Sequence, residues 1–324
     1  QRLDERWLPM RLEAMGLSNV LANDVMASSA PKLSEALKDY LQLKGMGKPK
    51  TFQQAAVRSA GVVIEICGDK ACPDYRTTDA GLVRDTLIDR GLRVASVRRS
   101  FNTIKAIFNL AIAEHGLDMR NPFASIFMPE GDSNKRVSIP VQTIRVIQQS
   151  CLEIDDDMRW LIALISDTGM RLGEAAGLEV SHIHLNEAIP YLTIEETDSR
   201  RLKTRESRRR VPLVGMALWA AKRAVEASKA QETTFLFPRY NKKDTTNSNS
   251  ASNALNKWMK EHIPPQYVLH GFRHAMRDRL REVDCPADVM DEIGGWSKQS
   301  VGQSYGKGSS LERLHRFMVQ VVLD

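Results

Sequence analysis

The chain has 324 residues, of which 42% are hydrophobic and 27% charged, as expected for a water-soluble globular protein of about two domains. No apolar run approaches the roughly 18 residues of a membrane span and no signal peptide opens the sequence, so neither membrane insertion nor secretion is expected. The net charge of +6 is compatible with a nucleic-acid partner without establishing one.

The N-terminal part divides into an unassigned segment and a helical region. Residues 1–30 match no domain pattern, and because the sequence starts at Gln1 rather than methionine, a further N-terminal piece is left open. Residues 31–128 are predicted to be helical, since apolar residues recur at three- and four-residue spacings. The strongest helix begins at Ser96 and lines one face with Val97, Phe101, Ile104, Phe108 and Ile112.

Basic residues lie off the apolar face of that helix. Arg98, Arg99 and Lys105 fit either plain solubility or a helix bundle laid on DNA. The polar, proline-bounded stretch MPEGDSNKRVSIP then predicts a linker over 129–137, followed by a second domain over 138–310.

The second domain is predicted to mix helices with a small antiparallel sheet. MRWLIALISDTGMRL indicates a buried helix broken near Gly169, and IPYLTIEE and RVPL indicate two strands around a turn at RES. Further helices are expected at 214–230, 250–262, 272–283 and 286–293, with a mobile loop at 241–252. An apolar C-terminal helix over 311–324 packs either on its own domain or on a neighbouring protomer.

Cysteines and histidines give no metal or disulfide pattern. The four cysteines lack ligand spacing, which predicts reduced thiols in the cytoplasm. His182 and His184 would share one face of a strand, but no third ligand is near them in the sequence, so no metal site is expected.

A basic run precedes the second strand. In SRRLKTRESRRR, residues 199–210, seven lysines and arginines accompany the single acid Glu206. A solvated hairpin and a phosphate-facing element both fit this run.

Three segments of the second domain carry candidate site residues. In TGMRLGEAAGL, Arg171 opens a helix and Glu174, three residues on, can orient its guanidinium. In LHGFRHAMRDRL, His270 precedes a helix with Arg273 in its first turn, where free backbone N–H groups would point at an anion. In GGWSKQSVGQSYG, Tyr305 lies among glycines and serines that give it little to pack against.

These three segments, in this order, resemble the signature boxes of the tyrosine recombinases, also called the phage integrase family. The KT and VPL at Lys203–Leu213 resemble the family's lysine-bearing hairpin, and SVRRSFNTIKAIFNLAIAEHGL with NPF resembles the end of its helical core-binding domain. The resemblance covers about residues 31–310. Trp296 stands where the family usually has a second histidine, and the arm-binding domain of some phage integrases is not visible.

The resemblance implies a mainly α fold with a small antiparallel β-sheet. A helical, SAM-like core-binding domain and an α+β catalytic domain would form a clamp around double-stranded DNA. It further implies strand exchange through a 3′-phosphotyrosine, a homotetramer on paired sites that is a monomer or dimer off DNA, and directionality or DNA-bending factors. The expected location is the cytoplasm of a bacterial or phage-infected cell, associated with the nucleoid.

The residue types suit that chemistry. Arg171 and Arg273 offer planar forks of donors for phosphate oxygens. Only about one tyrosine in a thousand is ionised at pH 7, so Tyr305 needs a proton acceptor, for which His270 fits. Lys203 is the candidate acid for the departing 5′-oxygen. No metal and no ATP is required, because the cations are built in and the phosphotyrosine conserves the bond energy.

Other residues have supporting assignments. The indole of Trp296 donates one hydrogen bond and cannot shuttle a proton, so it binds phosphate or buttresses the site. Additional DNA contacts are assigned to Arg205, Arg208, His274 and Arg277.

Three functions remain open on the sequence. The preferred one is an integrase of a phage, genomic island or similar mobile element. A chromosome or plasmid dimer resolvase, or a type IB topoisomerase-like enzyme, would use the same chemistry. A DNA-binding regulator without catalysis is the non-enzyme alternative, and the complete set of candidate catalytic residues argues against it.

Overall fold

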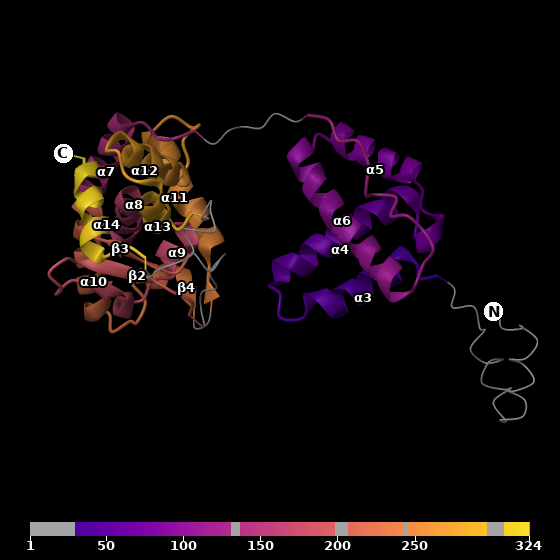
Figure 1. Ribbon diagram of the computed structural model, residues 1–324, viewed down its shortest axis with the longest axis horizontal. Helices are drawn as coiled ribbons and strands as arrows, with labels where there is room; N and C mark the ends of the chain where they lie inside the picture. The colour runs from indigo at the N-terminus through magenta and orange to yellow at the C-terminus, as the bar shows by residue number, and fades with distance from the viewer. Residues whose placement is uncertain (1–29, 131–136, 198–206, 243–244, 297–307, 324) are drawn as a thin grey trace, which may run out of the picture. The chain divides into compact units, whose positions relative to one another are not determined.

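The computed structural model describes residues 30–130, 137–197, 207–242, 245–296 and 308–323. The chain divides into two compact units, Gln1–Asn134 and Lys135–Asp324, which are called the N-terminal unit and the C-terminal unit below. Figure 1 labels most helices and several strands of the two units.

The described part of the N-terminal unit is helical. Its elements are α3 (Leu33–Gly45), α4 (Lys50–Cys67), the short 3-10 helix η1 (Cys72–Asp74), α5 (Thr77–Asp89) and α6 (Val94–Glu114). Helix α6 buries the face predicted from its periodicity, with Val97, Phe101, Ile104 and Phe108 inside and Ile112 partly buried. Helices α3, α4 and α6 contact one another around this face.

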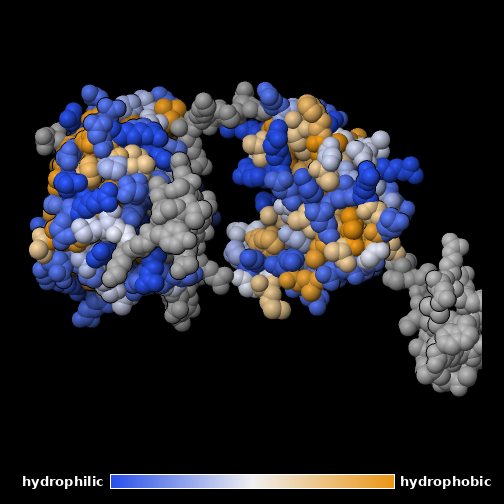
Figure 2. Space-filling view, viewed as in Figure 1, coloured by the Kyte–Doolittle hydropathy of each residue, from blue (hydrophilic) through white to orange (hydrophobic). Residues whose placement is uncertain are grey.

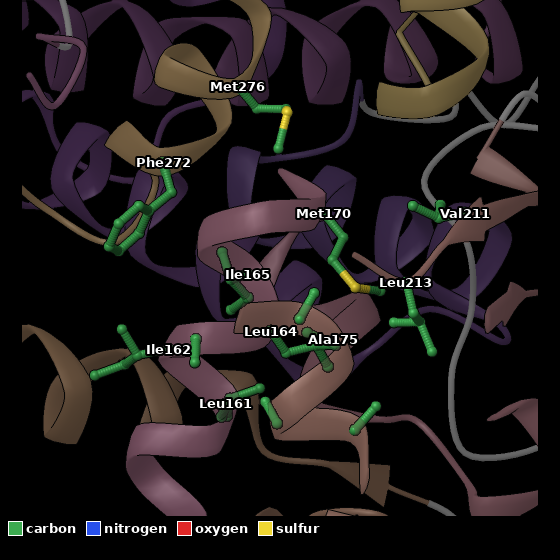
Figure 3. Close-up of a cluster of buried hydrophobic side chains, with 14 of the residues drawn as sticks. Leu161, Ile162, Leu164, Ile165, Met170, Ala175, Val211, Leu213, Phe272 and Met276 are labelled. Carbon is green, nitrogen blue, oxygen red and sulfur yellow. The ribbon is translucent and has the colours of Figure 1, made fainter. Parts of the chain in front are cut away.

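The C-terminal unit begins with three helices. These are α7 (Val141–Ile154), α8 (Asp157–Thr168) and the short α9 (Leu172–Ala176). Every residue of α8 from Leu161 to Thr168 is buried, so the predicted buried helix is confirmed. Gly169 ends α8 with a φ of +61°, in the left-handed region that glycine adopts without strain. Figure 3 shows Leu161, Leu164 and Ile165 of α8 inside the apolar cluster of this unit.

A small sheet and further helices surround α8. The 3-10 helix η2 (Val180–His182) leads into β1 (Ile183–His184), which pairs with β2 (Tyr191–Ile194), and β2 pairs with β3 (Arg209–Pro212), all antiparallel. Helices α10 (Gly215–Ala230), α11 (Ser248–His262), α12 (Gly271–Glu282) and α13 (Ala287–Gly294) follow. Helices α7, α10 and α12 pack on α8. The predicted fold, mainly helical with a small antiparallel sheet, is confirmed.

Residues 241–252 were predicted to form a mobile loop, but the described residues 241–242 and 245–252 contain regular structure. The 3-10 helix η4 (Pro238–Tyr240) runs into β4 (Asn241–Lys242), which pairs with β5 (Thr245–Thr246), and α11 starts at Ser248. The buried Asn241 amide donates to the carbonyls of Ala176 and Phe237 at 2.7 and 2.8 Å. The Asn247 side chain accepts the Ser250 N–H and caps α11. Two polar residues of this segment therefore have structural roles: Asn247 caps α11, and Asn241 forms buried hydrogen bonds to the backbone.

The C-terminal helix packs on its own unit. Helix α14 (Leu311–Met318) and η6 (Val319–Val321) contact β3, α12 and α13 and bury Leu314, Phe317 and Met318. Arg279 of α12 donates to the Val321 carbonyl and to the Asp167 carboxylate. Of the two placements left open by the sequence, the structure shows the one on the same chain.

Candidate active site

Two guanidinium groups from distant parts of the chain meet at one backbone carbonyl. Arg171 precedes α9 and Arg273 lies in the first turn of α12. Their Nη2 atoms both donate to the carbonyl oxygen of Gly295, at 3.1 and 3.3 Å respectively. The structure therefore brings together the two arginines that the sequence assigned to one anion site.

Arg273 is held by backbone carbonyls rather than by an acid. Its Nη1 donates to Gly169 at 2.9 Å and to Gly294 at 2.6 Å, and the residue is buried. Burial, then the charges of Arg171 and Arg209, lower the pKa of Arg273 to about 9, which leaves it protonated at pH 7. Among the described residues Arg273 has no carboxylate partner, and a buried cation in that situation favours an incoming anion.

Glu174 orients Arg171 through both oxygens, as its three-residue spacing predicted. Oε1 accepts from Arg171 Nη1 at 2.6 Å, and Oε2 accepts the Arg171 backbone N–H at 2.9 Å. Burial alone would raise the pKa of Glu174. The charge of Arg209 and hydrogen bonds from both arginines outweigh burial, so the pKa lies below its ordinary value.

Arg209 is a member of this group that sequence reasoning missed. It belongs to the basic run that was expected to be a solvated or phosphate-facing hairpin, yet its side chain is only 5% exposed and its Nη2 lies 3.0 Å from Glu174 Oε2. The available signal was strand periodicity: Arg209 alternates with Val211, which is buried on the same face of β3. Because Arg208, Arg209 and Arg210 are consecutive, the run of charges hid this alternation.

Trp296 lies against two arginines. The Arg273 guanidinium is 4.6 Å from the centre of the indole ring and that of Arg277 is 5.1 Å away. The ring also requires Gly294, because a Cβ there would lie 1.9 Å from the indole Cζ3. Arg171, Arg209 and Arg273 are called the arginine cluster below. Trp296 therefore contacts this cluster, through Arg273, from the side of α13.

His270 lies at the residue before α12, one turn from Arg273, and is partly exposed. Its ring packs edge-on against His274, with 5.3 Å between centres. The expectation of free N–H groups at this helix start is wrong. The N–H groups of Gly271, Phe272 and Arg273 donate to the carbonyls of Val268, Leu269 and His270, because a turn runs directly into the helix. The backbone donors at this helix start are therefore already taken up by protein carbonyls.

Lys203, Arg205 and Tyr305 lie outside the described residues. Described residues on both sides of Tyr305 attach to α13. The Trp296 N–H donates to the Asp291 backbone carbonyl at 3.0 Å, and the Ser309 N–H donates to Glu292 Oε2 at 2.9 Å. On the other side of the site, Ser207 Oγ accepts from Arg171 Nη1 at 3.1 Å.

The residues assigned to DNA contacts have varied environments. Arg208 is 77% exposed on its side chain, with Glu195 at 3.8 Å. Arg98 donates to the carbonyls of Met128 and Pro129, and Arg99 to Ser96 Oγ. Lys105 is partly exposed.

Two candidate DNA contacts lie closer to the arginine cluster. Arg277 lies 3.7 Å from Asp291. Among the described residues, Nε2 of His274 and Nε of Arg277 are buried atoms without a hydrogen-bond partner.

The described part of the chain has no metal-ligand cluster and no membrane-spanning helix. No group of three His, Cys, Asp or Glu residues there could hold a metal ion, and no helix there is long and apolar enough to cross a bilayer. His182 ends η2 and accepts the Glu179 N–H through Nδ1, whereas His184 stacks on Tyr191 from β1. The prediction that the two histidines share one face of a strand is therefore wrong, because His182 belongs to η2 and only His184 to β1.

Several known proteins resemble this chain. The tyrosine recombinase XerC of Salmonella typhi is 21% identical over 275 residues, which cover 82% of this chain and 87% of that protein. The lambda integrase tetramer bound to a Holliday junction has a TM-score of 0.65 at 17% identity, covering 92% of this chain and 89% of that chain. The Tn1549 transposon integrase in complex with circular intermediate DNA has a TM-score of 0.65 at 16% identity, covering 89% and 99%.

The sequence profile described as the phage integrase family matches residues 141–310, slightly more than half of the chain. That stretch runs from the start of α7 to the residue before α14 and includes every residue of the arginine cluster. The chain belongs to the phage integrase family and is a tyrosine recombinase.

Proposed function

We propose that this tyrosine recombinase is the site-specific integrase of a mobile genetic element, with Tyr305 forming a 3′-phosphotyrosine bond to DNA. The observation that carries the proposal is the charge balance at the meeting point of α9, α12 and α13. Among the described residues, the guanidinium groups of Arg171 and Arg209 share the carboxylate of Glu174, and the guanidinium of Arg273 beside them is held by backbone carbonyls. Such a surplus of buried positive charge suits a phosphodiester and its more strongly charged transition state.

The proposed cleavage step forms one bond, breaks one bond and transfers two protons. The Tyr305 oxygen attacks phosphorus while the bond to the 5′-oxygen breaks, and the new tyrosyl–phosphate bond keeps the DNA attached for rejoining. His270 accepts the tyrosine proton and Lys203 protonates the departing 5′-oxygen. Arg171 and Arg273 hold the non-bridging oxygens, and Trp296 supports Arg273 from the side.

Chain connectivity limits how far Tyr305 and Lys203 can lie from described residues. Tyr305 lies three residues before Gly308, which bounds the separation of their Cα atoms at roughly 11 Å. Lys203 lies four residues before Ser207, whose hydroxyl contacts Arg171, and the corresponding bound is roughly 14 Å. These bounds support the assignment of both side chains to the phosphate that Arg171 and Arg273 would hold.

The structural relatives support DNA as the partner. The lambda integrase is seen as a tetramer on a Holliday junction, and the Tn1549 integrase in complex with transposon right-end DNA. We infer that residues 31–128 form a core-binding domain, that 138–310 form the catalytic domain, and that both close around double-stranded DNA. Assembly would be tetrameric on paired sites in the bacterial cytoplasm, with accessory factors setting direction.

The test is covalent capture of the protein on DNA. A duplex selected by binding from a randomised-sequence library, then nicked at successive positions, should trap a covalent adduct that denaturing gel electrophoresis detects. Tyr305→Phe, which keeps the ring and removes the nucleophile, should abolish the adduct. An adduct of undiminished yield in Tyr305→Phe would refute the assignment.

A second assay separates the acid from the clamp. Lys203→Ala should lose cleavage on normal DNA and regain it on a 5′-phosphorothiolate substrate, because a thiolate leaves without a proton. Without that recovery, the acid role would belong to another residue. Integration of one circular DNA into another would favour the integrase over the resolvase and topoisomerase alternatives. A protein that binds DNA but forms no adduct would be the inactive regulator.

A further inference from the structure

Arg209 lies beside the assigned site residues, but none of the proposed reaction steps uses it. Each of its three guanidinium nitrogens donates to a protein oxygen. Nε donates to the Ile293 carbonyl at 2.9 Å, Nη1 to the Ser207 carbonyl at 2.8 Å and Nη2 to Glu174 Oε2 at 3.0 Å. One side chain therefore joins the start of β3, helix α9 and the end of α13.

This guanidinium is enclosed rather than presented to a ligand. The Arg209 side chain is 5% exposed, compared with 25% for Arg171 on the other side of Glu174. Gly295 lies directly against it, because a Cβ at that position would be 2.6 Å from Arg209 Nη1. Arg171 is thus the arginine of this pair that solvent, and so a phosphate, can approach.

Glu174 divides its carboxylate between the two arginines. Oε1 pairs with Arg171 Nη1, while Oε2 receives both the Arg171 backbone N–H and Arg209 Nη2. Without Arg209, Oε2 would lose a charged donor in a buried site, and the carboxylate would shift relative to the Arg171 guanidinium that it orients. The orientation of the Arg171 fork therefore depends on Arg209.

The same side chain holds the backbone two residues before the shared carbonyl of Gly295. Arg209 Nε holds the Ile293 carbonyl at the end of α13, two residues before Gly295, whose carbonyl receives Arg171 and Arg273. From these contacts we infer that Arg209 is a positioning residue for DNA cleavage, setting the spacing of the Arg171 and Arg273 forks without touching the phosphate. This inference rests on the proposed function.

The informative variant is Arg209→Lys. Lysine keeps the charge that Glu174 requires but is a point donor and cannot reproduce a planar fork with three separated acceptors. Arg210→Lys is the matched control, because Arg210 is the next residue of β3 and is exposed. Arg209→Ala is less informative, because it leaves Glu174 buried without one partner and threatens folding.

The assay is single-turnover cleavage of the selected nicked duplex by the full chain, with DNA affinity and thermal unfolding measured in parallel. Arg209→Lys should fold and bind DNA with affinity within about threefold of the original, yet cleave on the order of 10- to 100-fold more slowly. The 5′-phosphorothiolate should not restore its rate, in contrast to Lys203→Ala. Arg210→Lys should cleave at the original rate.

Several outcomes would overturn the inference. A folded Arg209→Lys that cleaves at the original rate, or one whose slow cleavage follows entirely from weaker binding, removes the positioning role. Full rescue by the phosphorothiolate would mean that Arg209 acts by positioning the acid Lys203 instead. Failure of Arg209→Lys to fold would make the residue purely structural. The proposed function is judged separately, by whether the unsubstituted chain forms an adduct that Tyr305→Phe lacks.

Discussion

Replacing Glu174 with glutamine tests the electrostatic arrangement of the site without changing its shape. The Glu174 side chain is 6% exposed and accepts one charge-assisted bond from each of two arginines. Removing one partner of a buried ion pair costs about 3–5 kcal/mol. Glutamine keeps one acceptor oxygen, so we expect Glu174→Gln to lower the free energy of unfolding by about 3 kcal/mol. For a unit of this size, that corresponds to a fall in Tm of about 6–12 °C.

Tryptophan fluorescence during thermal and urea unfolding can follow the C-terminal unit, which contains four of the five tryptophans. Glu226→Gln is the matched control, since Glu226 is 76% exposed and only 3.6 Å from Arg223. Exposed pairs of this kind contribute about 0.5 kcal/mol or less. The control should therefore unfold almost as the unsubstituted chain does.

The dependence of this stability difference on pH has a defined sign. The pKa of Glu174 in the folded state lies below its ordinary value of 4.5, because Arg209 and Arg171 outweigh the opposing effect of burial. The unfolded state therefore takes up the proton first as the pH falls. The stability gap to Glu174→Gln should be constant above about pH 5.5 and shrink as the pH falls from 4.5 through the folded pKa. A gap under about 1 kcal/mol at pH 7, or one unchanged down to pH 3, would refute the reasoning.

Three further outcomes are expected. Gly294→Ala would place a Cβ 1.9 Å from Trp296, so the indole should move off Arg273. The fluorescence emission maximum should shift and the free energy of unfolding should fall by about 1–3 kcal/mol, whereas unchanged emission would contradict this packing. Asn247→Ala removes the cap of α11 and should cost about 1 kcal/mol in urea unfolding, whereas no loss would mean that the cap is not used. DNA affinity should fall steeply with salt, and Arg208→Ala should reduce the slope of log K against log salt by about 1; an unchanged slope would remove Arg208 from the DNA surface.

Much of the fold could be predicted from the sequence because its signals are local. The apolar stripe on α6 and the continuous apolar run of α8 specify burial directly. Arg171 and Glu174 are three residues apart at the start of α9, so their contact is local and could be predicted from the spacing. The surface of the C-terminal unit seen in Figure 2 is largely hydrophilic, as the composition implied.

The remaining features depend on contacts between distant parts of the chain. Arg209 is buried because Glu174, Ile293 and Ser207 surround it, and a run of arginines does not reveal which member turns inward. The N–H groups at the start of α12 are occupied because the preceding turn supplies carbonyls. The order in residues 241–252 likewise depends on Asn241 reaching the carbonyl of Ala176.

The most direct test of the central claim is a structure of the covalent protein–DNA intermediate. We expect the phosphorus attached to Tyr305 to lie where donor nitrogens of both Arg171 and Arg273 are about 3 Å from its non-bridging oxygens. A phosphotyrosine with its oxygens more than about 6 Å from either guanidinium, or DNA attached to a different residue, would contradict the account.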